Sequence, residues 1–289
     1  MLRALVLGLL LTAAIARAAD PAAIVFMSDF GTDDDSVAIC KGVMVGISPQ
    51  SRIVDLTHTV PPYSVADGAR FLAGTAPAWP VGTVFVAVVD PGVGTSRRPV
   101  VARSKRGQWF VLPDNGLLTL VADRDGLAEV RQITNADWLR GGGISSTFHG
   151  RDIFAPVGAH IARGDDWTAV GPVITDPVRL PLPQARIDGD TLTGEVIAFD
   201  GPYGNLVTDV DAPLFLRLGW ARGDQVVVRI GERELTLPFV QTFGSVPEGQ
   251  PLLYIDSRER LAAAVNKGNF AERFGVTPGT RFTIRRKTP

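Results

Sequence analysis

The chain has 289 residues, of which 45% are hydrophobic and 20% charged, enough for one large or two ordinary domains with a sizeable core. Its formal net charge of −1 argues against a nucleic-acid binder that depends on phosphate contacts, but not against a small cationic or zwitterionic substrate. The single cysteine, Cys40, excludes an internal disulfide. Its apolar, helical context favours a buried thiol over a nucleophile.

The first residues have the pattern of an export signal. Arg3 forms a short basic region, Ala4–Ile15 is apolar but too short to span a membrane, and Ala16-Arg17-Ala18 fits the small-x-small cleavage rule. We therefore expect residues 1–19 to be a cleaved signal peptide and the mature chain to be periplasmic or secreted. A mis-assigned start codon is the alternative, and it would leave the protein in the cytoplasm.

Two apolar strands that lead into carboxylates organise the N-terminal half. Ala22–Met27 is followed by Asp29, and Val84–Val89 is followed directly by Asp90. Unbroken β-branched runs are typical of parallel strands covered by helices on both faces. Because open α/β sheets hold ligands at the carboxyl ends of their strands, the two aspartates predict a shared cleft. The alternative for Asp90 is a residue that caps a turn, with Arg97 as its solvated partner.

A cluster of acidic residues precedes a helix predicted over Val37–Ile47. Residues 33–36, read as three aspartates and a serine, fit helix capping and the helix dipole. A metal site that includes Asp29 is the alternative, but neither a nearby histidine nor calcium-loop spacing supports it. Further along, a short strand over Ile53–Leu56 leads to a rigid proline loop, on which Tyr63 could stack against a planar ligand or pack within the loop.

A hairpin and a histidine turn follow. Val100–Arg103 and Trp109–Leu112 predict a hairpin. His149 lies in a glycine-flanked polar turn just before a helix predicted over Ile153–Ala162, where it could act as a general base or orient water. An ordinary hydrogen-bonded histidine is the alternative, and it is the interpretation for His58 and His160.

Beyond a proline-rich stretch over residues 172–183, the pattern changes to short strands punctuated by glycine and proline. We read this stretch as a linker between an N-terminal domain over residues 20–178 and a C-terminal domain over residues 186–289. The strands are typical of an antiparallel barrel or sandwich. Leu261–Val265 is predicted as a single helix, and the loop Asp200–Asn205 offers an aromatic ring, an amide and backbone groups to a ligand.

Six motifs, in order, resemble the S-adenosyl-L-methionine (SAM) hydroxide adenosyltransferase family, hydrolases related to the SAM-dependent fluorinase and chlorinase. The motifs are FMSDFGTDDDSVAICKG, VDPGVGTSRR, PDNGLL, TFHGRD, FDGPYGN and LYIDSR. Each alone is weak, but their shared order covers nearly the whole mature chain. The resemblance implies an α/β fold, with a mostly parallel sheet in the N-terminal domain and a smaller C-terminal antiparallel β-barrel. It also implies a homotrimer with its active sites between subunits, SAM as the small-molecule substrate and no cofactor or metal.

The resemblance also assigns roles to residues. It places an Asp-Arg-His set beside the attacking water, at Asp90, Arg97 and His149. Asp29 would bind the ribose hydroxyls, and Tyr63 and Phe148 would pack on the sugar or adenine. The methionine contacts would fall on Asp34, Ser36, Asp200, Asn205, Ser257 and Arg258. Tyr203 and Tyr254 match aromatic positions of the adenine region, whereas Val265 and Lys267 depart from the halogenase pattern.

The implied reaction is hydrolysis of SAM to adenosine and L-methionine by attack of activated water at C5′. A SAM-dependent halogenase is one alternative, but the family's halogenases have tyrosine at the position of Asp90 and a long insertion for which Ser104–Phe110 leaves no room. The other is an exported module that binds SAM or adenosine without turnover. The export signal favours that module, because SAM is made inside cells.

Overall fold

The computed structural model describes residues 21–288, which form two compact units, one ending at Arg179 and one beginning at Leu180. The predicted signal peptide lies outside the described residues. None of the described helices is long and apolar enough to cross a bilayer.

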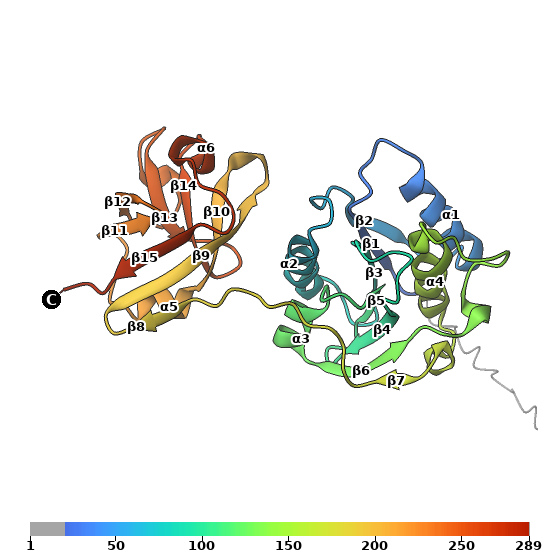
Figure 1. Cartoon of the computed structure of the whole chain (residues 1–289). Helices are drawn as coiled ribbons and strands as arrows, with labels where there is room; N and C mark the ends of the chain where they lie inside the picture. The colour runs from blue at the N-terminus through green and yellow to red at the C-terminus, as the bar shows by residue number, and fades with distance from the viewer. Residues whose placement is uncertain (1–20, 289) are drawn as a thin grey trace, which may run out of the picture. The chain divides into compact units, whose positions relative to one another are not determined.

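The N-terminal unit is built on a seven-stranded mixed sheet in the order β2-β1-β3-β5-β4-β6-β7 (Figure 1). The parallel strands are β1 (Ile24–Ser28), β2 (Ile53–Thr57), β3 (Val84–Val88) and β5 (Trp109–Pro113). The antiparallel extension comprises β4 (Pro99–Ser104), β6 (Leu127–Gln132) and β7 (Val173–Ile174). The predicted hairpin is thus the β4–β5 pair.

Helices cover both faces of this sheet, as the apolar runs predicted. Helices α1 (Ser36–Ile47) and α4 (Ala155–Arg163) lie on one face, and α2 (Val65–Thr75) and α3 (Thr119–Asp125) on the other (Figure 1). Alternate residues of β3 and the residue after it therefore enter two different cores, Val84, Val86 and Val88 on the α4 side and Phe85, Ala87 and Val89 on the α2 side.

Cys40 of α1 lies in the core on the α4 side and is completely buried. Burial raises the pKa of its thiol to about 12. A thiol that stays protonated is a poor nucleophile, so the prediction of an inert, buried cysteine is confirmed.

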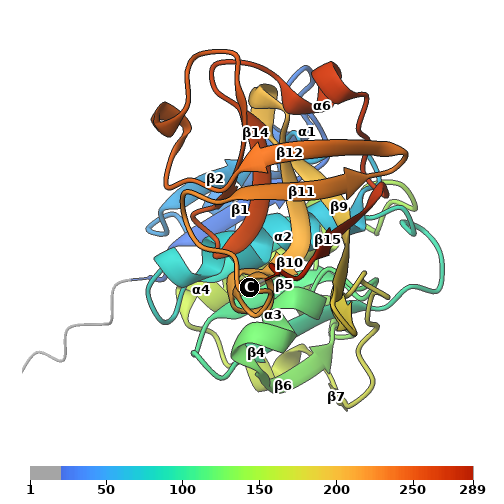
Figure 2. The same cartoon turned by 90° about the vertical axis from the view of Figure 1, so that its left-hand side faces the viewer.

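The C-terminal unit is an antiparallel sheet in the order β12-β11-β15-β9-β10-β14-β13, with β8 paired to β9. Its strands are β8 (Arg186–Asp188), β9 (Thr191–Asp200), β10 (Asn205–Asp211), β11 (Gln225–Ile230), β12 (Arg233–Pro238), β13 (Pro251–Ile255), β14 (Arg260–Val265) and β15 (Arg281–Arg285). Two short helices, α5 (Ala212–Leu216) and α6 (Phe270–Phe274), complete it. β11 and β12 run side by side across the front of Figure 2. A bridge between Phe239 and Leu253 nearly closes the sheet into a barrel, so the predicted fold class is confirmed.

One predicted element is wrong. Leu261–Val265 belongs to strand β14 and not to a helix. Its alanines favour a helix in isolation, but here Ala262 and Ala264 face one apolar cluster and Leu261, Ala263 and Val265 face another. Pairing with β10 and β13 on both sides therefore overrides the local helix propensity.

Close packing of α4 on β3 depends on a glycine, which has no side chain. A Cβ atom at Gly158 would lie 2.3 Å from Cγ2 of Val86. Replacing Gly158 with alanine should therefore lower the free energy of unfolding of the N-terminal unit by about 1–3 kcal/mol, because the core must shift to admit the methyl group. Urea denaturation followed by tryptophan fluorescence measures this, since all but one of the five tryptophans lie in this unit.

Gly42 provides the matched control on an open helix face. A Cβ atom there meets nothing within 4 Å. Gly42→Ala should leave stability unchanged or raise it by up to about 1 kcal/mol, because alanine favours the helix. Equal stabilities of the two variants would contradict the tight contact of α4 with β3.

Candidate active site

Asp90, Arg97 and His149 form one hydrogen-bonded cluster beyond the carboxyl end of β3. Arg97 donates from Nε to Oδ1 of Asp90 at 3.0 Å and from Nη2 to Oδ2. The same Nη2 lies 2.9 Å from Nδ1 of His149. The side chains of Arg97 and Asp90 are only 7% and 5% exposed. The structure thus brings together three residues that are separated by up to 59 positions in the sequence.

The hydrogen bonds define the protonation of the histidine. Arginine has no acceptor, so Arg97 must be the donor and Nδ1 of His149 the acceptor. The neutral imidazole then carries its proton on Nε2. Burial and the positive charge of Arg97 lower the pKa of His149, which favours this neutral form. Burial raises the pKa of the Asp90 carboxyl, although Arg97 opposes the shift by stabilising the charged form.

Two contacts hold the loops of this cluster in place. Gly94 adopts a positive φ of 75°, and a Cβ atom there would lie 2.4 Å from the carbonyl oxygen of Ser146. The turn that carries Arg97 and the loop that carries His149 can therefore approach only with glycine at this position. Asp152 is completely buried and accepts a hydrogen bond from the backbone N–H of Ser145 at 2.8 Å, which fixes the same loop from its other side.

Asp29 lies at the same edge of the sheet. Ser28 and Val88 are paired across the parallel strands β1 and β3, so Asp29 and Asp90 leave neighbouring strands on one side, as the sequence predicted. Oδ2 of Asp29 accepts a hydrogen bond from the backbone N–H of Tyr63 at 2.9 Å. Tyr63 is 73% exposed, so it is free to stack rather than packed in its loop.

A Ser-His-Asp chain supports the Asp29 loop. The Ser28 hydroxyl lies 2.7 Å from Nδ1 of His58, and Nε2 of His58 lies 3.0 Å from Oδ1 of Asp55. The residue types match a hydrolase triad, but the imidazole is reversed, with serine at Nδ1 and aspartate at Nε2. Ser28 is also completely buried, so no substrate can reach its hydroxyl. His58 also accepts the backbone N–H of Gly31 at its carbonyl oxygen, at 2.7 Å. The prediction of a hydrogen-bonded structural histidine is therefore confirmed.

The other predicted residues of the N-terminal unit lie around α1 and the His149 loop. Oδ1 of Asp34 accepts the backbone N–H of Ser36 at 2.9 Å, just before α1. The N-cap residue of α1 is Asp35, and its side chain makes no capping hydrogen bond, so the predicted side-chain cap is not formed. Phe148 packs edge-on against Phe30, with ring centroids 5.9 Å apart. In the described part of the chain, no group of three or more histidine, cysteine, aspartate and glutamate side chains is arranged to hold a metal ion.

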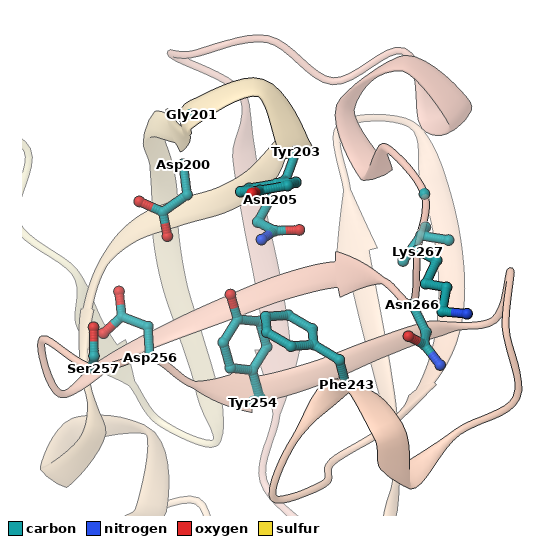
Figure 3. A pocket seen from close by; sticks show the side chains of 12 residues that line it. Asp200, Gly201, Tyr203, Asn205, Phe243, Tyr254, Asp256, Ser257, Asn266 and Lys267 are labelled. Carbon is teal, nitrogen blue, oxygen red and sulfur yellow. The ribbon is translucent and has the colours of Figure 1, made fainter.

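The predicted residues of the C-terminal unit surround a cavity of about 610 Å³ (Figure 3). They lie on β9, β10 and β13 and on the turns that follow β9 and β13. Those that line the cavity are Asp200, Tyr203, Asn205, Tyr254 and Ser257. Arg258 joins them by donating from Nη1 to Oδ1 of Asp200 at 3.3 Å.

Sequence reasoning missed part of the cavity wall. Phe243 packs edge-on against Tyr254 at 5.1 Å, and Asp256 and Asn266 also face the cavity. Asp256 stands inside the LYIDSR motif next to Ser257 and could have been found there. Phe243 and Asn266 have no local signal, because only the barrel brings them together. Val265 and Lys267, which depart from the halogenase pattern, line the same cavity.

Comparison with known proteins agrees with this arrangement. The family model for the SAM hydroxide adenosyltransferase N-terminal domain matches residues 24–171, and the model for its C-terminal domain matches residues 194–283. A curated (R)-S-adenosyl-L-methionine hydrolase from Salinispora tropica is 41% identical, over 90% of this chain and 96% of that protein. A fluorinase from Actinoplanes sp. is 34% identical, also over 90% of this chain and 96% of that protein.

A solved structure has the same fold. The crystal structure of an uncharacterized conserved protein from Thermotoga maritima matches with a TM-score of 0.87 and 38% identity. The match covers 91% of this chain and all of that one. With both family models matched and the predicted motifs grouped at one sheet edge and one barrel cavity, the chain belongs to the SAM hydroxide adenosyltransferase family.

Proposed function

We propose that this protein hydrolyses SAM to adenosine and L-methionine. The observation that carries the proposal is the buried Asp90–Arg97–His149 cluster at the ligand-binding edge of the N-terminal sheet. It occurs in a chain that is 41% identical to a curated (R)-S-adenosyl-L-methionine hydrolase.

The substrate supplies its own leaving group. Water attacks C5′, the new O–C5′ bond forms, and the C5′–S bond breaks with its electron pair on sulfur, so methionine departs as a neutral thioether. Water is a weak nucleophile at neutral pH and must be oriented and deprotonated. No electrons are gained or lost overall and the leaving group needs no Lewis acid, so we propose that the reaction uses no cofactor or metal.

The hydrogen bonds favour Asp90 as the proton acceptor. His149 accepts from Arg97 at Nδ1 and carries its proton on Nε2, so it can donate to the water but cannot take a proton from it. Each oxygen of Asp90 accepts one hydrogen bond from Arg97 and keeps a second lone pair. Arg97 therefore holds Asp90 in place and ionised, Asp90 takes the proton, and His149 orients the nucleophile.

The proposed substrate contacts come from the N-terminal sheet edge and from the C-terminal cavity. We propose that Asp29 binds the ribose hydroxyls and that Tyr63 and Phe148 pack on the sugar or adenine. Tyr203 and Tyr254 line the adenine region. The proposed methionine contacts are Asp34, Ser36, Asp200, Asn205, Ser257 and Arg258.

Halogenation is the nearest rival. The Asp90 carboxylate would repel a halide ion, whereas it can accept a hydrogen bond from water. The β4–β5 connection is a tight turn from Ser104 to Gln108, without a long insertion. The other rival, a binding module without turnover, would not require a buried Asp-Arg-His cluster.

We propose that the chain acts as a homotrimer whose active sites lie between subunits. Support comes from the resemblance and from the distribution of the proposed contacts, which fall on two separate units of the chain. Light scattering of the purified protein should give three times the chain mass. A monomer would contradict the proposed assembly.

We also propose that the protein is exported, because of the basic and apolar pattern of residues 1–19. Cell fractionation with N-terminal sequencing tests this. An intact N-terminus on a cytoplasmic protein would exclude export.

Removing the charge of Asp90 tests the reaction. Asp90→Asn should lower SAM turnover by at least about 100-fold, because the amide cannot take a proton. Chromatography of SAM incubated with mature protein, with and without chloride, should show adenosine and methionine in equal amounts. Formation of a 5′-halo-adenosine would instead indicate a halogenase, and intact SAM bound to the protein would indicate a binding module.

The neighbouring aspartate–arginine pair provides a control. Arg98 donates from Nε to Oδ2 of Asp114 at 2.9 Å, outside the proposed catalytic cluster. Asp114→Asn should keep SAM turnover close to wild type. Equal losses of activity in Asp90→Asn and Asp114→Asn would contradict the role of Asp90.

The pKa shifts predict the pH profile. The active form needs ionised Asp90, whose pKa is raised from 3.8, and neutral His149, whose pKa is lowered from 6.5. Both groups lose their protons as the pH rises, so kcat/KM should increase on the acidic side and be level above about pH 7. A value of kcat/KM that falls between pH 5 and 7 would contradict these protonation states.

A further inference from the structure

One end of the cavity in the C-terminal unit is acidic. Asp200, Asp256 and Ser257 lie together at this end, the rings of Tyr203, Tyr254 and Phe243 lie in the middle, and Asn266 and Lys267 lie at the far end (Figure 3). The carboxylates of Asp200 and Asp256 point toward one another (Figure 3). A ligand in this cavity therefore meets concentrated negative charge at one end.

Asp256 is the unusual member of this group. The residue is 7% exposed, and its Oδ1 accepts the backbone N–H groups of Arg258 and Arg260 at 2.8 and 2.9 Å. Its Oδ2 is sealed from water and has no hydrogen-bond partner in the described part of the chain. A buried carboxylate oxygen without a partner is costly, and the turn needs only Oδ1.

The charge at this end is not balanced by the cavity's own residues. Arg258 pairs with Asp200 at 3.3 Å, whereas Asp256 forms no ion pair among the described residues. Lys267 lies at the opposite end and pairs with Glu248 at 2.9 Å. Two carboxylates against one guanidinium leave a net negative charge.

The negative field reaches the cavity interior. Burial raises the pKa of the Tyr254 hydroxyl, and the charges of Asp200 and Asp256 raise it further. Because Asp256 is shielded from water, its charge is screened less than that of an exposed aspartate.

We infer that Asp256 is a specificity-determining residue, whose buried charge selects a ligand with a net positive arm over its neutral counterpart. The inference rests on the proposed function. The ammonium and carboxylate of the methionine arm form a neutral pair, so the sulfonium supplies the net charge of SAM. A sulfonium has no N–H or O–H to donate, so its charge is recognised through an electric field rather than through a hydrogen bond to the sulfur.

The sign of the kinetic effect follows from the chemistry. The positive charge on sulfur disappears as the C5′–S bond breaks, so a negative field stabilises bound SAM more than the transition state. Asp256→Asn should therefore raise the KM for SAM without lowering kcat. A lowered kcat with an unchanged KM would overturn the inference.

Two stable ligands differ by a positive charge near the position of sulfur. Sinefungin carries an ammonium-bearing carbon in place of the sulfonium, and S-adenosylhomocysteine has a neutral sulfur but the same amino-acid arm. Calorimetric titration of the mature protein should show tighter binding of sinefungin. Asp256→Asn should weaken sinefungin binding about tenfold and that of S-adenosylhomocysteine by less than about twofold, because only one of them has the extra charge.

The asparagine variant keeps the turn intact, since its amide oxygen can still accept from Arg258 and Arg260. If Asp256→Asn weakens the binding of both ligands equally, Asp256 only holds this turn. If it weakens the binding of neither, Asp256 has no part in ligand recognition. Either result overturns the inference. The inference also falls if wild-type protein binds neither ligand.

A second carboxylate in the same unit serves as the control. Asp209 is half-buried, and its Oδ1 accepts the backbone N–H of Glu195 at 2.7 Å, outside this cavity. Asp209→Asn should leave the preference for sinefungin unchanged. If wild-type protein prefers sinefungin but does not release adenosine from SAM, the hydrolase proposal fails while the selectivity stands.

Discussion

The hydrogen-bonded pair of Asp90 and Arg97 is the interaction on which the proposed chemistry depends. Neither side chain would tolerate burial alone, because an isolated charge is costly away from water. Together they are almost fully buried at the end of β3, and the same guanidinium determines which nitrogen of His149 carries the proton. One arginine therefore sets the charge of the acceptor and the tautomer of the neighbouring imidazole.

The parts of the fold that local pattern determines could be predicted from the sequence. Val84–Val88 has an apolar residue at every position, and such a strand has to be covered on both faces, as it is by α4 and α2. Asp29 and Asp90 could be placed at one edge because parallel strands end together. The local sequence of strand β14 favours a helix, and the cause of its strand conformation, pairing with β10 and β13, lies in distant residues.

In the candidate site, too, local sequence identifies some features while others depend on distant contacts. Residue types and motif order single out Asp90, Arg97 and His149, but their hydrogen bonds depend on the contact of Gly94 with Ser146, which no local pattern reveals. Similarly, Ser28, His58 and Asp55 make a serine–histidine–aspartate chain whose meaning depends on burial. Ser28 is fully buried, which only the folded structure reveals, and its burial identifies these hydrogen bonds as structural.

The burial of Cys40 has a consequence for where this protein can work. Its thiol is sealed in the α1–α4 core and stays protonated, so oxidants and disulfide exchange have no thiolate to attack. With no other cysteine in the chain, the folded protein forms no internal disulfide whatever the redox potential around it. Its fold therefore does not depend on whether the surroundings favour disulfides or thiols.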